Sequence, residues 1–219
     1  MMLARASAHS PISTVDGLTW NPSGIGYCQP SVYSRLIYDQ AYFDAFDRNA
    51  RTDLGRALMH ARCNFVEQHY RGVLIDVGIG SGAFIELRQR RRRPTYGYDI
   101  NPAGIRWLEQ RKLFIDPYLV AFDAMTLWDV LEHIDHFEPL LANVREWLFL
   151  SLPIFRDREH ARTSKHFKPD EHCWYFTRDG LVSAMTDCGF TLVTESNIES
   201  ELGREDIGTF AFRRAADGL

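Results

Sequence analysis

The stretch VLIDVGIGSGAF, residues 73–84, is the strongest local signal in the chain. An apolar run leads into Asp76, and glycines follow at alternate positions, at Gly78, Gly80 and Gly82. A buried strand, a tight turn and the beginning of a helix give this pattern. Because glycine has no Cβ, backbone amides in such a turn can approach a ligand closely, and the helix N-terminus favours an anion or a carboxylate. We therefore expect a ligand-binding turn between a strand and a helix.

Two cofactor families fit this stretch. The pattern G-x-G-x-x-A over residues 78–83 fits a dinucleotide fingerprint, with Asp99 about 20 residues further on as the ribose partner. An acid directly before the glycines instead suits a ligand that carries an ammonium group. The segment D-x-G-x-G-x-G, residues 76–82, resembles motif I of the class I S-adenosylmethionine-dependent methyltransferases. The resemblance implies that Asp76 holds the methionine end of the cofactor, through its ammonium group or a water, while the glycine backbone packs against the cofactor.

The composition is that of an ordinary globular protein. The chain has 219 residues, enough for one α/β domain, and its net charge of −4 argues against a general nucleic-acid-binding role. Four scattered cysteines without a C-x-x-C pair predict neither a zinc finger nor a disulfide framework, and they favour a cytoplasmic location. The first residues lack the apolar core of a signal peptide, and the longest apolar run, 147–155, is too short to cross a bilayer.

The N-terminal part differs from the rest of the chain. We expect an N-terminal arm and lid segment over residues 1–52 and a methyltransferase domain over residues 53–219. Residues 1 to about 30 are rich in glycine, proline and serine without a period, which is typical of a loose arm. Aromatic residues then recur at Tyr33, Tyr38, Tyr42, Phe43 and Phe46. They either pack a short helix into the core or, as the resemblance implies, form a lid over the cofactor, with Tyr42 as the contact.

Strand and helix patterns alternate through the remaining sequence. Asp53 is a candidate cap for a helix whose apolar residues are spaced by three and four and which ends near Gly72. Strands are expected at 73–76, 95–100, 122–127, 147–155, from 190, and at 208–214, with a further helix over 177–188. This alternation predicts a parallel sheet covered on both faces, with the last two strands as an antiparallel edge. Together with the resemblance, it indicates an α/β, Rossmann-like class I methyltransferase fold with a mostly parallel seven-stranded sheet, an antiparallel C-terminal strand and helices on both faces.

The expected cofactor contacts lie at the ends of these strands. Asp99 ends the second strand, where its carboxylate can accept both hydroxyl hydrogens of a ribose, and Asn101 already supplies the cap of the next helix. Trp128 ends the following strand, where the resemblance places residues that face the methionine end. The predicted cofactor contacts are Tyr42, Asp76, Gly78, Gly80, Gly82, Asp99, Ile100 and Trp128.

A short acidic segment follows that strand. Asp129, Glu132 and His133 are spaced by three and one, so one helical turn places them on neighbouring faces. The segment is similar to the E-x-x-E-H stretch of quinone-precursor O-methyltransferases, which implies that these three residues hold a divalent cation. The alternative is a solvated helix start whose acids are stabilised by the helix dipole.

The most polar and aromatic stretch is SKHFKPDEHCWYFT, residues 164–177. A cluster of this kind in a loop after a strand is typical of binding and catalytic groups. Histidine can act as a base near neutral pH, so we predict His166, His172 and Glu171 as the catalytic residues. The same residues could instead form a metal site, or the stretch could be a hydrogen-bonded surface loop in which Thr177 caps the next helix.

These features favour an S-adenosylmethionine-dependent methyltransferase that acts on an oxygen of a small-molecule or glycan-like acceptor, because a base helps methyl transfer only when the acceptor is a hydroxyl. A nucleic-acid-modifying methyltransferase is supported only by the basic run 88–93, which is otherwise a solvated helix end. The glycine pattern is also compatible with an NAD-binding oxidoreductase, and the fold is compatible with a non-catalytic binding module.

Overall fold

A computed structural model describes residues 17–29 and 38–215, and the strands in these ranges form one nine-stranded sheet. Its centre consists of four parallel strands in the order β4 (Thr95–Tyr98), β3 (Leu74–Val77), β5 (Phe122–Trp128) and β6 (Val144–Phe155). The strand β9 (Ile207–Arg214) pairs antiparallel with β6 and with β8 (Phe190–Ser196). This arrangement confirms the predicted α/β fold and its antiparallel C-terminal strand.

The sheet is wider than the seven strands expected from the sequence. The strand β7 (Trp174–Thr177) pairs parallel with the end of β6, so the predicted loop 164–177 ends in a strand. The hairpin of β1 (Thr19–Trp20) and β2 (Ile25–Tyr27) then adds antiparallel to β7. The prediction of a loose arm is therefore wrong for residues 17–29, because the partner of this hairpin lies about 150 residues away in the sequence and leaves no local pattern. Residues 1–16 and Tyr33 lie outside the described residues.

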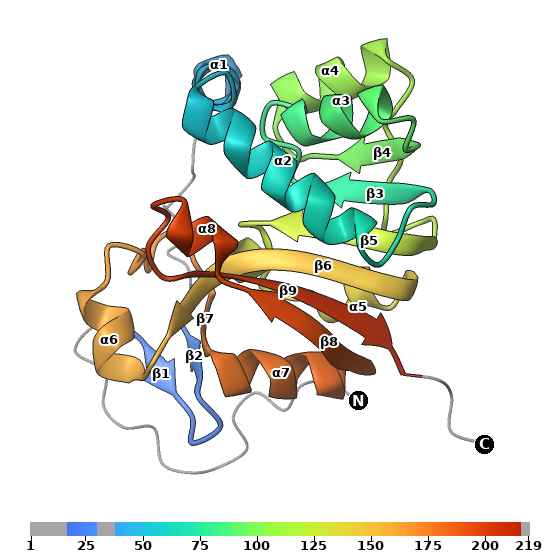
Figure 1. Ribbon diagram of the computed structural model, residues 1–219. Coiled ribbons are helices and arrows are strands. Elements are labelled where there is room, and N and C mark those ends of the chain that lie inside the picture. Colours follow the sequence, from blue (N-terminus) through green and yellow to red (C-terminus); the bar gives the residue numbers. More distant parts are fainter. Residues whose placement is uncertain (1–16, 30–37, 216–219) are drawn as a thin grey trace.

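Helices cover both faces of the sheet (Figure 1). One face carries α2 (Asp53–Glu67), α3 (Ala83–Arg90) and α4 (Pro102–Gln110), and the opposite face carries α5 (Glu138–Leu141) and α7 (Arg178–Asp187). The shorter α1 (Gln40–Ala50) precedes α2, and the remaining elements are η1 (Leu131–His133), α6 (Arg158–Thr163) and α8 (Ile198–Glu201). No helix within the described ranges is long and apolar enough to cross a membrane.

The helix ends follow the sequence with two corrections. The two predicted caps are confirmed: Asn101 accepts a hydrogen bond from the backbone N–H of Ala103, and Thr177 accepts one from the backbone N–H of Gly180. The cap of α2 is Thr52 rather than Asp53, since the Thr52 hydroxyl accepts from the backbone of Gly55 at 3.0 Å. The helix also ends at Glu67, earlier than expected from the position of Gly72.

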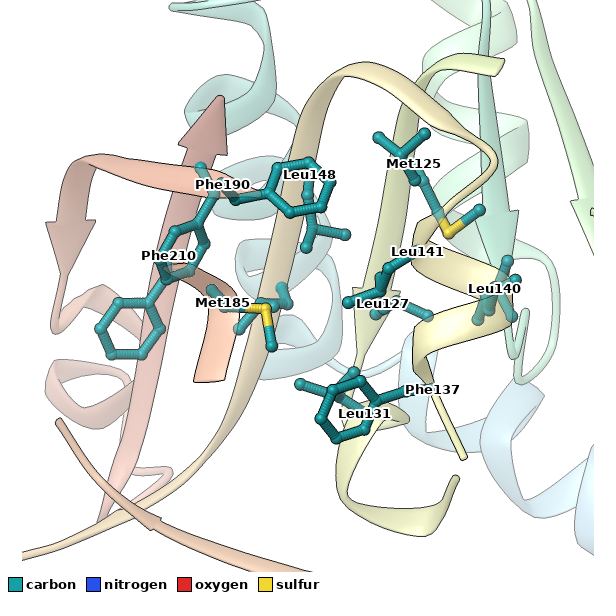
Figure 2. Packing of buried hydrophobic residues seen from close by; sticks show 14 of the residues in the cluster. Met125, Leu127, Leu131, Phe137, Leu140, Leu141, Leu148, Met185, Phe190 and Phe210 are labelled. Atoms are coloured by element: carbon teal, nitrogen blue, oxygen red, sulfur yellow. The ribbon is translucent and has the colours of Figure 1, made fainter. Parts of the chain in front are cut away.

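The largest core lies between the sheet and the helices α5 and α7 (Figure 2). Met125 and Leu127 of β5, together with Leu148 of β6, pack against Leu140 and Met185 of the two helices. A second core on the opposite face contains the buried aromatic residues Phe65, Phe84, Trp128, Trp147 and Phe149. The two cores fix the central strands, and with them the strand ends that carry the candidate site.

The basic run 88–93 is not a uniform solvated helix end. Arg88 is fully buried, and its guanidinium donates to the hydroxyl of Thr95 at 2.9 Å and to the carbonyl of Gly72 at 3.3 Å. These bonds connect α3 with the segments that lead into β3 and β4. The sequence could not reveal the burial of Arg88, because nothing in the local pattern distinguishes this arginine from those that follow it.

Candidate functional site

The glycine stretch forms the predicted turn between β3 and α3. Gly78, Gly80 and Gly82 have φ angles of +73°, +56° and +79°, in the left-handed region that side chains disfavour. A Cβ at Gly78 would also lie 2.4 Å from a methyl carbon of Val130, which is too close for any side chain. The turn therefore requires glycine for its backbone conformation and for its close packing.

The carboxylate of Asp76 is buried at the end of β3. The residue is 1% exposed, and the hydroxyl of Thr126, its partner across the β3–β5 pair, donates to Oδ1 at 2.6 Å. Burial raises the pKa of Asp76 to about 7. A positively charged group placed nearby would stabilise the ionised carboxylate, so this acid is suited to respond to a cationic ligand.

Asp99 follows β4, the strand adjacent to β3, so the two acids lie at the same end of neighbouring strands. Its carboxylate accepts the backbone N–H of Asn101 at 2.8 Å, and the backbone amides of Ile100, Ile79 and Gly80 also stabilise its charged form. Burial still raises its pKa. The next side chain, Ile100, is 61% exposed and presents an apolar surface beside the acid.

The helix α1 lies against this strand end. The side-chain amide of Asn101 donates to the backbone carbonyl of Asp39, the cap of α1, at 3.1 Å. The ring of Phe46 lies 3.0 Å from the position that a Cβ of Gly80 would occupy, so α1 packs on the glycine turn. Tyr42 contacts Phe46 with ring centroids 4.8 Å apart. Burial raises the pKa of Tyr42 to about 12, and the charge of Asp99 contributes, so its hydroxyl remains protonated near the turn.

Trp128 lies at the end of β5 with its ring in the core. The ring contacts Phe84 at a centroid distance of 5.4 Å, and the guanidinium of Arg62 lies 5.0 Å from its centre. Its indole N–H is buried without a hydrogen-bond partner in the part of the chain that the structure describes. The side chain thus forms an inner wall of the strand end.

A network of four buried or half-buried charges surrounds Asp129, the residue that follows β5, and no local sequence pattern indicates it. Arg62 donates to Glu199 at 2.7 Å and to Asp129 at 2.8 Å, and Arg204 donates to Asp129 at 2.9 Å and also to Glu199. The two guanidinium groups lower the pKa of Asp129. Its partners are 67 and 75 residues away in the sequence, so spacing alone could not reveal them.

The predicted cation ligands Asp129, Glu132 and His133 are not gathered as expected. Both oxygens of Asp129 are held by arginines, and its φ of +58° turns the chain away from a regular helix. The potential ligand atoms of Glu132, His133 and His172 instead lie within 4.8 Å of one another. The rings of the two histidines are perpendicular, with centroids 4.6 Å apart. In the structure, His172 rather than Asp129 is therefore the third member of this group.

The predicted catalytic group of His166, Glu171 and His172 is also divided. His166 contacts the backbone carbonyl of Glu205 at 2.9 Å, and the carboxylate of Glu171 pairs with Lys168 at 3.0 Å. His172 is 4% exposed, and burial lowers its pKa to about 3, so its ring is neutral at physiological pH. Burial and the charge of Asp129 raise the pKa of Glu132 well above its usual value.

A family model described as a methyltransferase domain matches residues 46–195, which is more than half of the chain. No curated protein sequence matches the chain.

Solved structures are similar in fold at low sequence identity. A 1,6-didemethyltoxoflavin-N1-methyltransferase from Burkholderia thailandensis, with its substrate and S-adenosylhomocysteine bound, is 15% identical with a TM-score of 0.58, over 80% of this chain and 84% of that chain. An S-adenosylmethionine-dependent methyltransferase from Archaeoglobus fulgidus is 16% identical with a TM-score of 0.56, over 79% and 100%. The magnesium protoporphyrin IX methyltransferase from Synechocystis PCC 6803, with bound S-adenosylhomocysteine, is 14% identical with a TM-score of 0.55, over 81% and 96%.

Proposed function

This chain belongs to the methyltransferase-domain family, and we propose that it transfers the methyl group of S-adenosylmethionine to an oxygen of a small-molecule or glycan-like acceptor. The family match favours methyl transfer over the dinucleotide-dependent oxidoreduction that the glycine pattern alone left open. The burial of Arg88 weakens the case for a nucleic-acid acceptor, because the basic run is not a continuous exposed patch.

The cofactor is assigned to the ends of β3 and β4. Asp76 and Asp99 lie on neighbouring strands beside the left-handed glycine turn, and this juxtaposition supports the proposal most directly. We assign the methionine end to Asp76, whose burial points to contact through a water or through a small displacement. The ribose hydroxyls are assigned to Asp99, and the exposed side chain of Ile100 and the ring of Tyr42 provide surfaces for the adenosine.

The oxygen acceptor is assigned to the group of Glu132, His133 and His172. Aligning the acceptor with the sulfonium methyl supplies much of the rate of methyl transfer, and a hydroxyl acceptor must also lose its proton. The acceptor oxygen forms a bond to the methyl carbon while the S–CH₃ bond breaks and its electron pair stays on sulfur. The products are the methyl ether, S-adenosylhomocysteine and a proton that leaves to solvent, and the polar group beside the acceptor orients its hydroxyl for this transfer.

The experiment incubates the full chain with methyl-labelled S-adenosylmethionine and matched acceptor pairs, such as a phenol and its aniline or a sugar and its amino sugar. We expect label in the hydroxyl compounds and formation of S-adenosylhomocysteine. Preferential labelling of the amines would contradict an oxygen acceptor. Oligonucleotide binding that weakens steeply with salt would favour a nucleic-acid acceptor.

The replacement His172→Ala separates the acceptor side from the cofactor side. A group that positions the acceptor can cost about 10²-fold in turnover when it is removed, so we expect a loss of this size with an almost unchanged affinity for S-adenosylhomocysteine. His136→Ala is the matched control, since this histidine lies on the neighbouring segment with 63% of its side chain exposed. An equal loss of turnover and cofactor affinity would show that His172 serves the fold rather than the acceptor.

A further inference from the structure

The group of Glu132, His133 and His172 brings together two segments that are about 40 residues apart. Glu132 and His133 belong to η1 after β5, whereas His172 directly precedes β7. Backbone contacts hold the segments in register, because the N–H of Cys173 donates to the carbonyl of Glu132 at 2.7 Å. The indole of Trp174 also donates to the carbonyl of Ile134 at 3.0 Å. The three side chains are therefore fixed by rigid neighbours rather than by a flexible loop.

The hydrogen bond of His133 sets its tautomer. Its Nδ1 lies 3.0 Å from the backbone carbonyl oxygen of Glu171, and a carbonyl can only accept, so Nδ1 carries the hydrogen. The lone pair of the neutral ring is then on Nε2. Donation of one ring N–H to a carbonyl, with the other nitrogen left as a ligand, is the usual environment of metal-binding histidines.

The third group supplies the charge. Glu132 is 2% exposed, and its Oε2 has no hydrogen-bond partner among the described residues. A buried carboxyl oxygen without a partner is costly, and a cation bound at this position would compensate that cost. This observation is independent of the spacing of the three residues and points to the same ligand.

We propose that Glu132, His133 and His172 bind one divalent transition-metal cation of the Zn²⁺ type, whose open coordination position takes an oxygen of the acceptor. Two imidazoles and one carboxylate are a donor set that suits such cations, and three protein ligands leave at least one position for another molecule. Mg²⁺ and Ca²⁺ prefer all-oxygen sites and fit this set poorly. Only the contact with the acceptor rests on the proposed function, and the binding of the cation does not.

The position of the group agrees with a role beside the cofactor. Val130, two residues before Glu132, packs on the glycine turn of the cofactor side, where a Cβ on Gly78 would lie 2.4 Å from one of its methyl carbons. The proposed cation site is thus a neighbour of the strand ends assigned to S-adenosylmethionine.

The experiment titrates the metal-free full chain with Co²⁺ and follows the visible absorption that cobalt gains in a site with nitrogen ligands. We expect one equivalent to bind, to be displaced by Zn²⁺ and to be unaffected by excess Mg²⁺. His172→Ala and the isosteric Glu132→Gln should each weaken cobalt binding by at least about tenfold. Removing a residue that only hydrogen-bonds to a metal ligand already costs about that much, and loss of a ligand itself costs no less. His136→Ala should bind as the unchanged protein does.

Two results would overturn the proposal: the unchanged protein shows no saturable cobalt spectrum, or both ligand variants retain it. A second measurement separates ligand loss from misfolding, since Zn²⁺ should raise the melting temperature of the unchanged protein and not that of Glu132→Gln. All of these titrations are made without S-adenosylmethionine or acceptor. A protein that binds the cation but methylates no hydroxyl would refute the proposed acceptor and leave the cation site standing.

Discussion

The two sides of the candidate site are built from different material. The cofactor side is built mainly on a glycine turn and the two acids next to it, Asp76 and Asp99, which lie within about 30 residues of sequence. The acceptor side consists of buried side chains from distant segments, namely the group that contains His172, and the charge network around Arg62 adjoins it through Asp129. A site built from backbone tolerates few side-chain additions, whereas a site built from buried charges tolerates few side-chain deletions.

The largest effect is expected from Arg62→Met, which removes one side of the network and leaves Asp129 and Glu199 buried with less compensation. Breaking a buried ion pair in this way costs about 3–5 kcal/mol of unfolding free energy. Arg51→Met is the matched control, because its ion pair with Asp47 has the same 2.8 Å length but lies on the surface, where a pair is worth about 0–1 kcal/mol. Denaturant unfolding measures the loss of unfolding free energy in each variant. Similar losses would show that the buried network is no more sensitive to a deletion than a surface ion pair.

The next effect is expected from Asp99→Asn on the cofactor side. Hydrogen bonds to charged groups contribute about 1.5–3 kcal/mol, so the affinity for S-adenosylhomocysteine should fall by roughly 10- to 100-fold. Calorimetry with the free cofactor product measures this change. The variant Asp123→Asn, at a surface acid on β5, should bind normally. Normal binding by Asp99→Asn would remove the ribose assignment.

A similar or smaller effect is expected from Gly78→Ala, which adds a Cβ in a left-handed conformation against Val130. Strain at such a position costs about 1–3 kcal/mol. Gly203→Ala is the control, since Gly203 has a φ of +93° but no neighbour within 4 Å of the added carbon. The difference in unfolding free energy between the two variants therefore measures the packing of the turn, and equal values would show that packing contributes nothing.

The smallest effect concerns pH and Asp76. Its pKa is raised from 3.8 to about 7, so the folded protein retains a proton that the unfolded chain has lost, and this contribution to stability disappears as the pH rises through about 7. A cationic ligand favours the ionised form, so cofactor affinity should instead increase between pH 6 and 7.5, by at most about tenfold per pH unit. Asp76→Asn should remove this dependence. A flat profile in the unchanged protein would refute the assignment of the methionine end.

The cofactor side is predictable from the sequence because its signals are local. Glycines with positive φ and an acid before them leave a short pattern, and Asp99 follows in the next strand. The acceptor side is only partly predictable. The spacing of Glu132 and His133 indicates a pair, but the prediction of Asp129 as their partner is wrong, because Asp129 is held by arginines from remote segments. The contact between His133 and His172 depends on the pairing of β7 with β6, which no local period encodes.

The hairpin of β1 and β2 gives residues 17–29 an importance that the family match, which begins at residue 46, does not suggest. Gly26 pairs with Tyr175, and the N–H of Cys28 donates to the carbonyl of Cys173, next to His172. A chain shortened to begin at residue 38 would lack the hairpin but keep α1 with Tyr42, the glycine turn and both acids of the cofactor side, and it would uncover the outer edge of β7. Such a protein should still recognise S-adenosylhomocysteine, yet associate through the uncovered edge and lose its selectivity for the acceptor.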